Sequence, residues 1–116
     1  MTVTTVLAAI PSSDLDVSRP WWSTLLGREP DLVPMPTDLE WHVPEGGGLQ
    51  LIEDAERAGS GSVTLVVDDV GAEVDAARGR GLDVPHAQTV PSGQFRLSVL
   101  ADPDGNRVVL AESLER

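Results

Sequence analysis

The sequence contains no cysteine, no tyrosine and no lysine, so all of its basic residues are arginines. Without lysine the chain cannot form a Schiff base, attach pyridoxal phosphate or supply the lysine of a phosphate-binding loop. Without cysteine it has no thiolate nucleophile, disulfide or iron–sulfur ligand. Imidazole chemistry is restricted to His42 and His86. These absences exclude several classes of covalent and redox catalysis.

Positive charge is also scarce, because 8 arginines stand against 19 Asp and Glu residues and leave a formal net charge of -11. A surface of this charge repels nucleic acid and anionic lipid, whose affinity for proteins comes largely from cationic side chains. The N-terminal residues lack a basic signal-peptide region, and no apolar run approaches the ~20 residues of a membrane span. We expect a cytoplasmic protein with no nucleic-acid or membrane partner, folded as a single domain over residues 1–116.

Extended runs and helix signals follow one another in the same order in both halves of the chain. The first predicted helix ends at Gly27, a typical left-handed cap, and carries Pro20 in its first turn if regular helix begins near Asp16. The second begins with the carboxylates of residues 68–69 and ends at residues 79–81. The predicted strands cover residues 2–10, 31–34, 39–43, 49–53, 62–67, 87–90, 94–101 and 107–112.

An internal duplication explains this order. Residues 43–47 (Val-Pro-Glu-Gly-Gly) match residues 102–106 (Asp-Pro-Asp-Gly-Asn), and each segment is a turn between two strands. The same overlay matches Leu7 with Ser62 and Gln50 with Val109. The sequence therefore predicts two β-α-β-β-β units, over about residues 3–53 and 61–112.

Three segments resemble signature motifs of the vicinal oxygen chelate superfamily, which includes glyoxalases, bleomycin-resistance proteins and extradiol dioxygenases. They are residues 14–27, residues 61–69 and residues 102–112, and together with the duplication they span nearly the whole chain. The resemblance implies an α+β fold in which two paired β-α-β-β-β modules form a cupped, mixed β-sheet with helices on its opposite face.

The resemblance also locates the four positions at which the superfamily binds a metal ion. In this chain they are Leu7, Gln50, Ser62 and Val109. Leucine and valine have no donor atom, and one hydroxyl with one amide falls far short of the imidazole and carboxylate donors that such ions require. Glu112 does not replace them, because strand alternation turns it to the other face. We therefore predict no metal and no cofactor.

Strand alternation, fixed by these positions, also predicts which side chains line the cup. The residues that alternate with the cup residues along each strand are predicted to face the helices, and almost all of them are large and aliphatic. Trp41 is expected beneath the cup, and an outward position is the more frequent one for Arg96 in so acidic a chain. The predicted cup residues are Leu7, Ala9, Gln50, Ile52, Ser62, Thr64, Val66, Val109 and Ala111, with Glu40, His42, Phe95, Leu97 and Val99 on the outer strands.

Three functions fit these predictions. The leading hypothesis is a metal-independent protein, most simply a homodimer, that binds or sequesters an aromatic or amphipathic small molecule in the cup. The second is a metal-free isomerase, lyase or cyclase in which Glu40, His42 or Gln50 transfers a proton or orients the substrate. A surface strand without catalytic role is the simpler interpretation of Glu40 and His42, because no nucleophile completes a triad. The third is a regulatory or structural subunit whose cup is filled.

Overall fold

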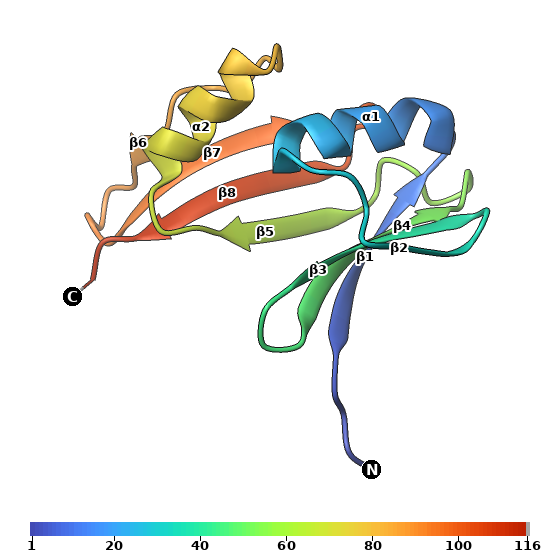
Figure 1. Cartoon of the computed structure of the whole chain (residues 1–116). Helices are drawn as coiled ribbons and strands as arrows, with labels where there is room; N and C mark the ends of the chain where they lie inside the picture. Colours follow the sequence, from blue (N-terminus) through green and yellow to red (C-terminus); the bar gives the residue numbers. More distant parts are fainter. Residues whose placement is uncertain (116) are drawn as a thin grey trace.

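The computed structural model describes residues 1–115 and contains two helices and eight strands (Figure 1). Their order repeats once, since each half has a strand, a helix and then three strands. The elements are β1 (Val6–Ser12), α1 (Leu15–Leu26), β2 (Leu32–Met35), β3 (Asp38–Val43), β4 (Gly47–Glu53), β5 (Ser62–Val66), α2 (Val70–Gly79), β6 (Gln88–Thr89), β7 (Phe95–Ala101) and β8 (Arg107–Ser113).

Each half of the chain builds one four-stranded mixed sheet. The strand order is β1-β4-β3-β2 in the first sheet and β5-β8-β7-β6 in the second. In both sheets the first strand runs parallel to the last, and the remaining pairs are antiparallel. Ala9 pairs with Gln50 in the first sheet as Thr64 pairs with Val109 in the second, so the two sheets share one register. The predicted α+β fold is confirmed.

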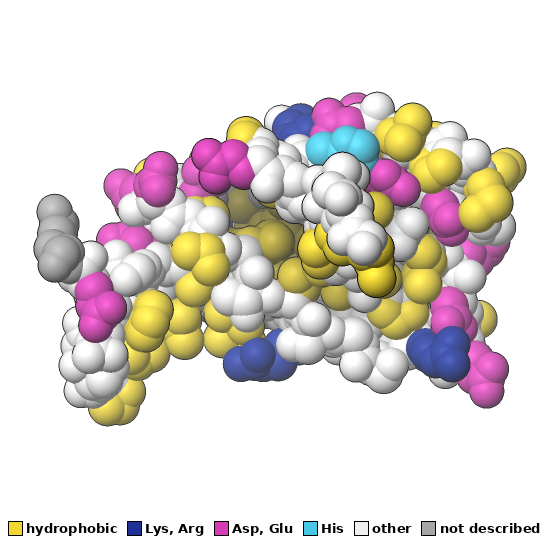
Figure 2. All heavy atoms as spheres, turned by 90° about the horizontal axis from the view of Figure 1, so that it is seen from below, with side chains coloured by type: hydrophobic (Ala, Val, Ile, Leu, Met, Phe, Trp, Pro, Cys, Tyr) yellow, Lys and Arg dark blue, Asp and Glu magenta, His cyan; other side chains and the backbone are white. Residues whose placement is uncertain are grey.

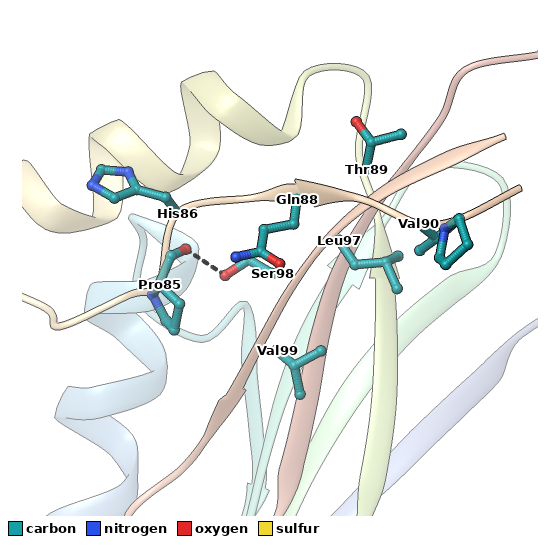
Figure 3. Close-up of a pocket in the computed structure, with 9 residues that line it drawn as sticks. Pro85, His86, Gln88, Thr89, Val90, Leu97, Ser98 and Val99 are labelled. Atoms are coloured by element: carbon teal, nitrogen blue, oxygen red, sulfur yellow. Dashed lines mark hydrogen bonds between the residues drawn. The ribbon is translucent and has the colours of Figure 1, made fainter. Parts of the chain in front are cut away.

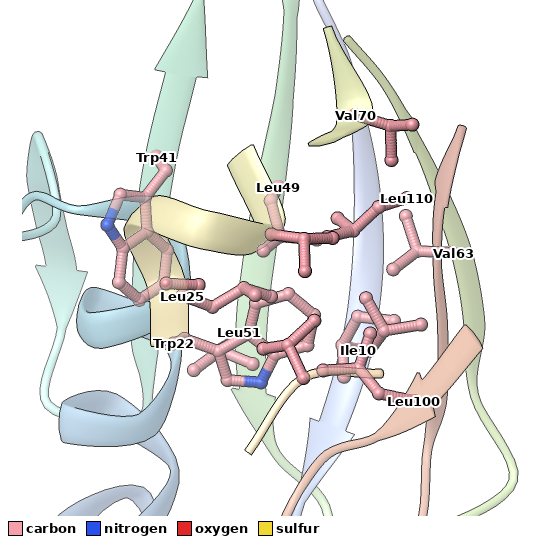
Figure 4. Packing of buried hydrophobic residues seen from close by; sticks show 14 of the residues in the cluster. Ile10, Trp22, Leu25, Trp41, Leu49, Leu51, Val63, Val70, Leu100 and Leu110 are labelled. Atoms are coloured by element: carbon pink, nitrogen blue, oxygen red, sulfur yellow. The ribbon is translucent and has the colours of Figure 1, made fainter. Parts of the chain in front are cut away.

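The hydrophobic core lies between the sheets and the two helices, which cover the same side of the molecule (Figure 1). Trp22 from α1 and Trp41 from β3 are its largest fully buried side chains. Figure 4 shows them packed with aliphatic side chains of both sheets, among them Ile10, Leu51 and Leu100. All the side chains that we predicted to face the helices pack in or against this core. They are Leu49, Leu51, Val63, Leu65, Val67, Val108 and Leu110.

The first helix corrects one prediction. It begins at Leu15, where Asp14 caps it by accepting a 3.0 Å hydrogen bond from the Asp16 backbone N–H. Pro20 consequently lies inside the helix and not in its first turn, and its missing N–H leaves the Asp16 carbonyl without a helical donor. Burial of Trp22 on the same helix offsets this cost.

The first strand also differs from its prediction, since it covers Val6–Ser12 and not residues 2–10. Residues 2–5 extend beyond the first residue of β4, so they have no strand beside them. At the other end the strand passes through Pro11, which pairs with Ile52. A proline fits here because β1 is an edge strand that pairs only with β4, so no second strand needs a hydrogen bond from the backbone N–H that proline lacks.

Asp102, in the turn between β7 and β8, joins the two modules from inside the core region. Its carboxylate accepts hydrogen bonds from the Trp22 indole N–H at 3.2 Å and from the Asn106 side-chain amide at 2.9 Å. It also accepts the backbone N–H groups of Asp104 and Asn106. A buried carboxylate with four donors is stable without a counter-ion.

Of the helices within residues 1–115, none is long and apolar enough to cross a membrane.

Candidate functional site

The sheet face turned away from both helices carries the candidate site. Figure 2 shows this face, with hydrophobic side chains lining a hollow and acidic side chains gathered along its rim. Leu49 and Leu51 belong to the core, so Gln50 and Ile52 between them point to the hollow face. The same alternation places every predicted cup residue there. Their part in ligand binding stays a prediction.

On the first sheet the hollow face carries an acid–base pair. The Glu40 carboxylate Oε1 lies 2.8 Å from the His42 Nε2, and the two side chains are 12% and 44% exposed. Trp41, between them in sequence, is buried in the core, as predicted. Gln50 pairs directly with Glu40, so its amide lies on the same wall. The pair can hold one proton between imidazole and carboxylate and exchange it with a bound molecule.

A second set of contacts fixes the backbone beneath this pair. Asp31 Oδ2 accepts the His42 backbone N–H at 2.6 Å and the Arg28 guanidinium at 2.6 Å. Arg28 also donates to the His42 carbonyl oxygen at 2.5 Å. The His42 N–H and the Arg28 guanidinium hold the pKa of the Asp31 carboxyl below its ordinary value. The strand segment bearing His42 is thus tied to the loop before β2.

The four superfamily metal positions lie on the parallel strand pairs β1–β4 and β5–β8, but their side chains do not fit a divalent ion. Leu7 and Val109 contribute only hydrocarbon, Gln50 one amide and Ser62 one hydroxyl. Within residues 1–115 no group of three or more His, Asp or Glu side chains is placed to hold a metal. Glu112 faces the helices, as predicted, and its Oε1 accepts the Val70 backbone N–H at 2.9 Å. No chemical step can therefore be assigned to a metal at these positions.

On the second sheet, β7 presents apolar side chains to the hollow face. Phe95, Leu97 and Val99 alternate with Ser98 and Leu100, which are buried on the helix side. Val109 shares the face of Val99, yet it is only 4% exposed because its neighbours cover it. A ligand on this wall would therefore meet the side chains of β7 before that of Val109.

A cavity of about 360 Å³ lies beside β7, where residues 85–91 run along the strand. Leu97 and Val99 line it, and Figure 3 shows Ser98 turned away from them to donate to the Pro85 carbonyl oxygen at 2.6 Å. Apart from Ser98, the remaining lining residues belong to the segment around β6 (Gln88–Thr89) and were not among the predicted cup residues, because so short a strand shows no alternation of apolar and polar residues. They are Pro85, His86, Gln88, Thr89, Val90 and Pro91.

Thr64 lines a different hollow, of about 330 Å³, at the free edge of β5. This hollow lies between the ends of α1 and β5, and Leu25, Val43 and Leu65 also border it. Arg96 is on the helix side of β7, where its guanidinium approaches Gly71 at the start of α2. It therefore lies on the face of the sheet opposite the hollow.

Comparison with known proteins decides the family. A family model described as a glyoxalase-like domain matches residues 6–111. The chain belongs to the glyoxalase-like family. The glyoxalase/bleomycin resistance protein from Catenulispora acidiphila is similar to it, with 31% identity over 93% of this chain and 96% of that one and a TM-score of 0.86. No curated protein matches the chain.

Two further solved structures share the fold of this glyoxalase-like protein at lower identity. A bleomycin resistance determinant encoded on the transposon Tn5 has 16% identity, covers 96% of this chain and 98% of that one, and has a TM-score of 0.78. A bleomycin-binding protein solved with bleomycin has 17% identity, covers 94% and 98%, and has a TM-score of 0.77. Likeness at this identity shows the fold alone. Together with the family model and the 31% identical relative, it confirms the resemblance to the vicinal oxygen chelate superfamily.

Proposed function

We propose that this glyoxalase-like protein binds an aromatic or amphipathic small molecule on the hollow face of its sheets, without a metal ion. One observation carries the proposal: the family scaffold is complete, but its metal positions hold Leu7, Gln50, Ser62 and Val109. A scaffold that keeps its hollow and lacks metal donors is suited to binding.

The chemistry of the hollow face supports this function. Ligand sites are mostly apolar and contain few orienting polar groups. Here Leu97 and Val99 supply apolar surface beside a cavity of about 360 Å³, while Glu40, His42 and Gln50 supply hydrogen-bonding groups. The bleomycin-binding neighbour shows that the same fold accommodates an organic ligand.

We propose further that the protein is a cytoplasmic homodimer. Large apolar side chains are exposed on its strands, including Val66 at 75%, and a monomer of this size rarely exposes many of them together. A second copy seated against these strands would cover them and complete the walls of the hollow. The other exposed strand residues of this kind are Val6, Leu32, Val33, Met35, Val43, Phe95 and Val99.

Native mass spectrometry of protein purified without chelator tests these statements together. We expect the mass of a metal-free dimer, with or without an added mass of organic size. Stoichiometric divalent metal would overturn metal independence, because the four positions would then bind an ion through donors other than those assigned here. A monomer at micromolar concentration would overturn the dimer.

One observation favours an enzymatic alternative, which is the 2.8 Å contact between Glu40 and His42. When the imidazole carries its proton on Nε2, the carboxylate accepts a hydrogen bond from that N–H and fixes the tautomer, so Nδ1 is left to take a proton from a bound molecule. Gln50, on the same wall, could orient a carbonyl. The chemistry available is proton transfer, as in an isomerase, lyase or cyclase reaction.

The substitution His42→Ala tests this alternative. If the protein is such an enzyme, the variant loses at least about a hundredfold in turnover of any substrate found, and chelator has no effect on the wild type. Glu53→Ala is the control, since Glu53 is exposed at the end of β4 and alternates with Ile52, so it faces away from the hollow. Equal turnover in wild type and His42→Ala would remove His42 as the base.

A further inference from the structure

We propose that the cavity beside β7 binds an uncharged, compact ring compound that carries a carboxamide or lactam group. The ring lies against Leu97 and Val99, and the side-chain amide of Gln88 pairs with the amide of the ligand. This inference rests on the proposed function and adds the location, the chemical class and the orientation of the ligand. All three side chains belong to the β6–β7 hairpin of the second sheet.

Backbone pairing places these three side chains within reach of one small molecule. Gln88 on β6 pairs directly with Leu97 on β7, so both side chains point to the same face of the sheet. Side chains paired in this way have Cβ atoms about 5 Å apart, and a diagonal neighbour two residues along the strand, here Val99, lies about 7–8 Å away. A single ring with one polar substituent spans these distances.

The size and the apolar lining of the cavity suit a compact ring. Its volume of about 360 Å³ lies near the lower end of the range of ligand pockets, which is about 300–1,000 Å³. Leu97, Val99 and Val90 line it together with two prolines, and Figure 3 shows Val90 beside Leu97. A ring bound here would remove hydrocarbon surface from water.

Among the residues that the structure describes, no carboxylate or guanidinium lines this cavity. Arg96 pairs with Thr89 and lies on the opposite face of the sheet. His86 is the one ionisable side chain of the lining, and Figure 3 shows its ring directed away from Leu97 and Val99. A charged ligand would lose hydration here without gaining a counter-charge, and salt screens the distant charges of the surface. An uncharged ligand is therefore favoured.

Gln88 is the polar lining residue best placed to orient such a ligand. Ser98 is buried, and its hydroxyl donates to the Pro85 carbonyl oxygen at 2.6 Å. Thr89 points to the other face, with Arg96. Gln88 is exposed, and Figure 3 marks no hydrogen bond from its amide to the other residues drawn. Because an amide has an acceptor oxygen and two N–H donors, it matches a ligand that presents an N–H beside a carbonyl.

Calorimetric titration with four probes that share a naphthalene ring tests the proposal: naphthamide, naphthalenemethanol, naphthoate and naphthylmethylammonium. Wild type should bind naphthamide about tenfold more tightly than the alcohol, and the two charged probes more weakly than the alcohol. Gln88→Leu should reduce the amide-to-alcohol affinity ratio to about one, and its binding of the alcohol shows that the variant is folded. Leu97→Ala should weaken the amide and the alcohol by a similar factor, because both place their ring on this side chain.

Gln94→Leu is the matched control, since it makes the same change at an exposed position of the turn between β6 and β7 that does not line the cavity. It should keep the wild-type ratio. Equal affinities for the amide and the alcohol, tighter binding of either charged probe, or an unchanged ratio in Gln88→Leu would overturn the inference and leave the proposed function standing. If the wild type binds none of the four probes, the proposed function is overturned, and the inference with it.

Discussion

The Asn106 side-chain amide donates a 2.8 Å hydrogen bond to the Pro11 carbonyl oxygen, and so ties the last hairpin to the first strand. Its Oδ1 accepts the backbone N–H groups of Gly59 and Gly61 in the connector between the modules, at 3.0 and 2.8 Å. The residue is fully buried. One amide thus links the first strand, the connector between the modules and the last hairpin.

Substitution of Asn106 should therefore destabilise the whole domain. Asn106→Ala leaves two N–H groups and one carbonyl without partners, and we expect a loss of about 3 kcal/mol in the free energy of unfolding. Asn106→Asp keeps the acceptor but places a carboxylate beside Asp102, so its loss should be at least as large. Urea denaturation measures both. Gln94→Ala, at an exposed turn, should change stability by less than about 0.5 kcal/mol.

The two adjacent tryptophans should differ in their tolerance of phenylalanine. Trp22→Phe removes the indole donor to Asp102, and with it about 2 kcal/mol of stability, because the buried carboxylate loses a partner. Trp21→Phe is the matched control, since Trp21 is partly buried and packs edge-on against Trp22 with ring centroids 5.1 Å apart. Thermal unfolding should show the smaller shift for Trp21→Phe. Equal shifts would mean that ring volume, and not the hydrogen bond, is what matters.

Arg80 joins the second helix to the first. Its Nε and Nη2 donate to the carbonyl oxygens of Thr24 and Leu25 at 2.6 and 2.9 Å, at the C-terminal end of α1. A cation there donates hydrogen bonds to free carbonyl groups and interacts favourably with the negative end of the helix dipole. Arg80→Ala should therefore lower the free energy of unfolding, measured with denaturant, by about 1 kcal/mol. Arg57→Ala, which removes an exposed ion pair with Asp54, should cost less than about 0.5 kcal/mol. Similar values for the two variants would contradict this assignment.

The lowered pKa of Asp31 gives a prediction about pH. The His42 backbone N–H is its main cause and Arg28 the second, so Arg28→Met should raise the pKa of Asp31 only part of the way to the ordinary value of 3.8. Because the folded-state pKa is depressed, the stabilisation from Asp31 is present above the unfolded-state value and is lost as the pH falls through the folded-state value. An NMR titration of the Asp31 carboxyl in both proteins checks this. Arg57→Met should leave the titration unchanged.

Local patterns were sufficient to predict the elements and the faces of the strands. The helix caps at Asp69 and Gly27 and the alternation around Leu49 and Leu51 act over a few residues, so their physical causes can be seen in the sequence. The duplication then placed Glu40 and His42 on the same face as Gln50. The contact between Glu40 and His42 follows directly from spacing by two on one strand.

Only the tertiary structure shows where the conformation departs from local sequence preferences. Pro20 sits inside a helix and Pro11 inside a strand, because burial of Trp22 and the edge position of β1 outweigh the local cost of proline. The segment carrying His86 lines a cavity only because it runs beside β7. The amino-acid sequence by itself determined the elements and the loss of metal donors, since these depend on neighbours along the chain and on residue type. The shape of the hollow and the joining of the modules depend on contacts between distant residues, which only the folded chain brings together.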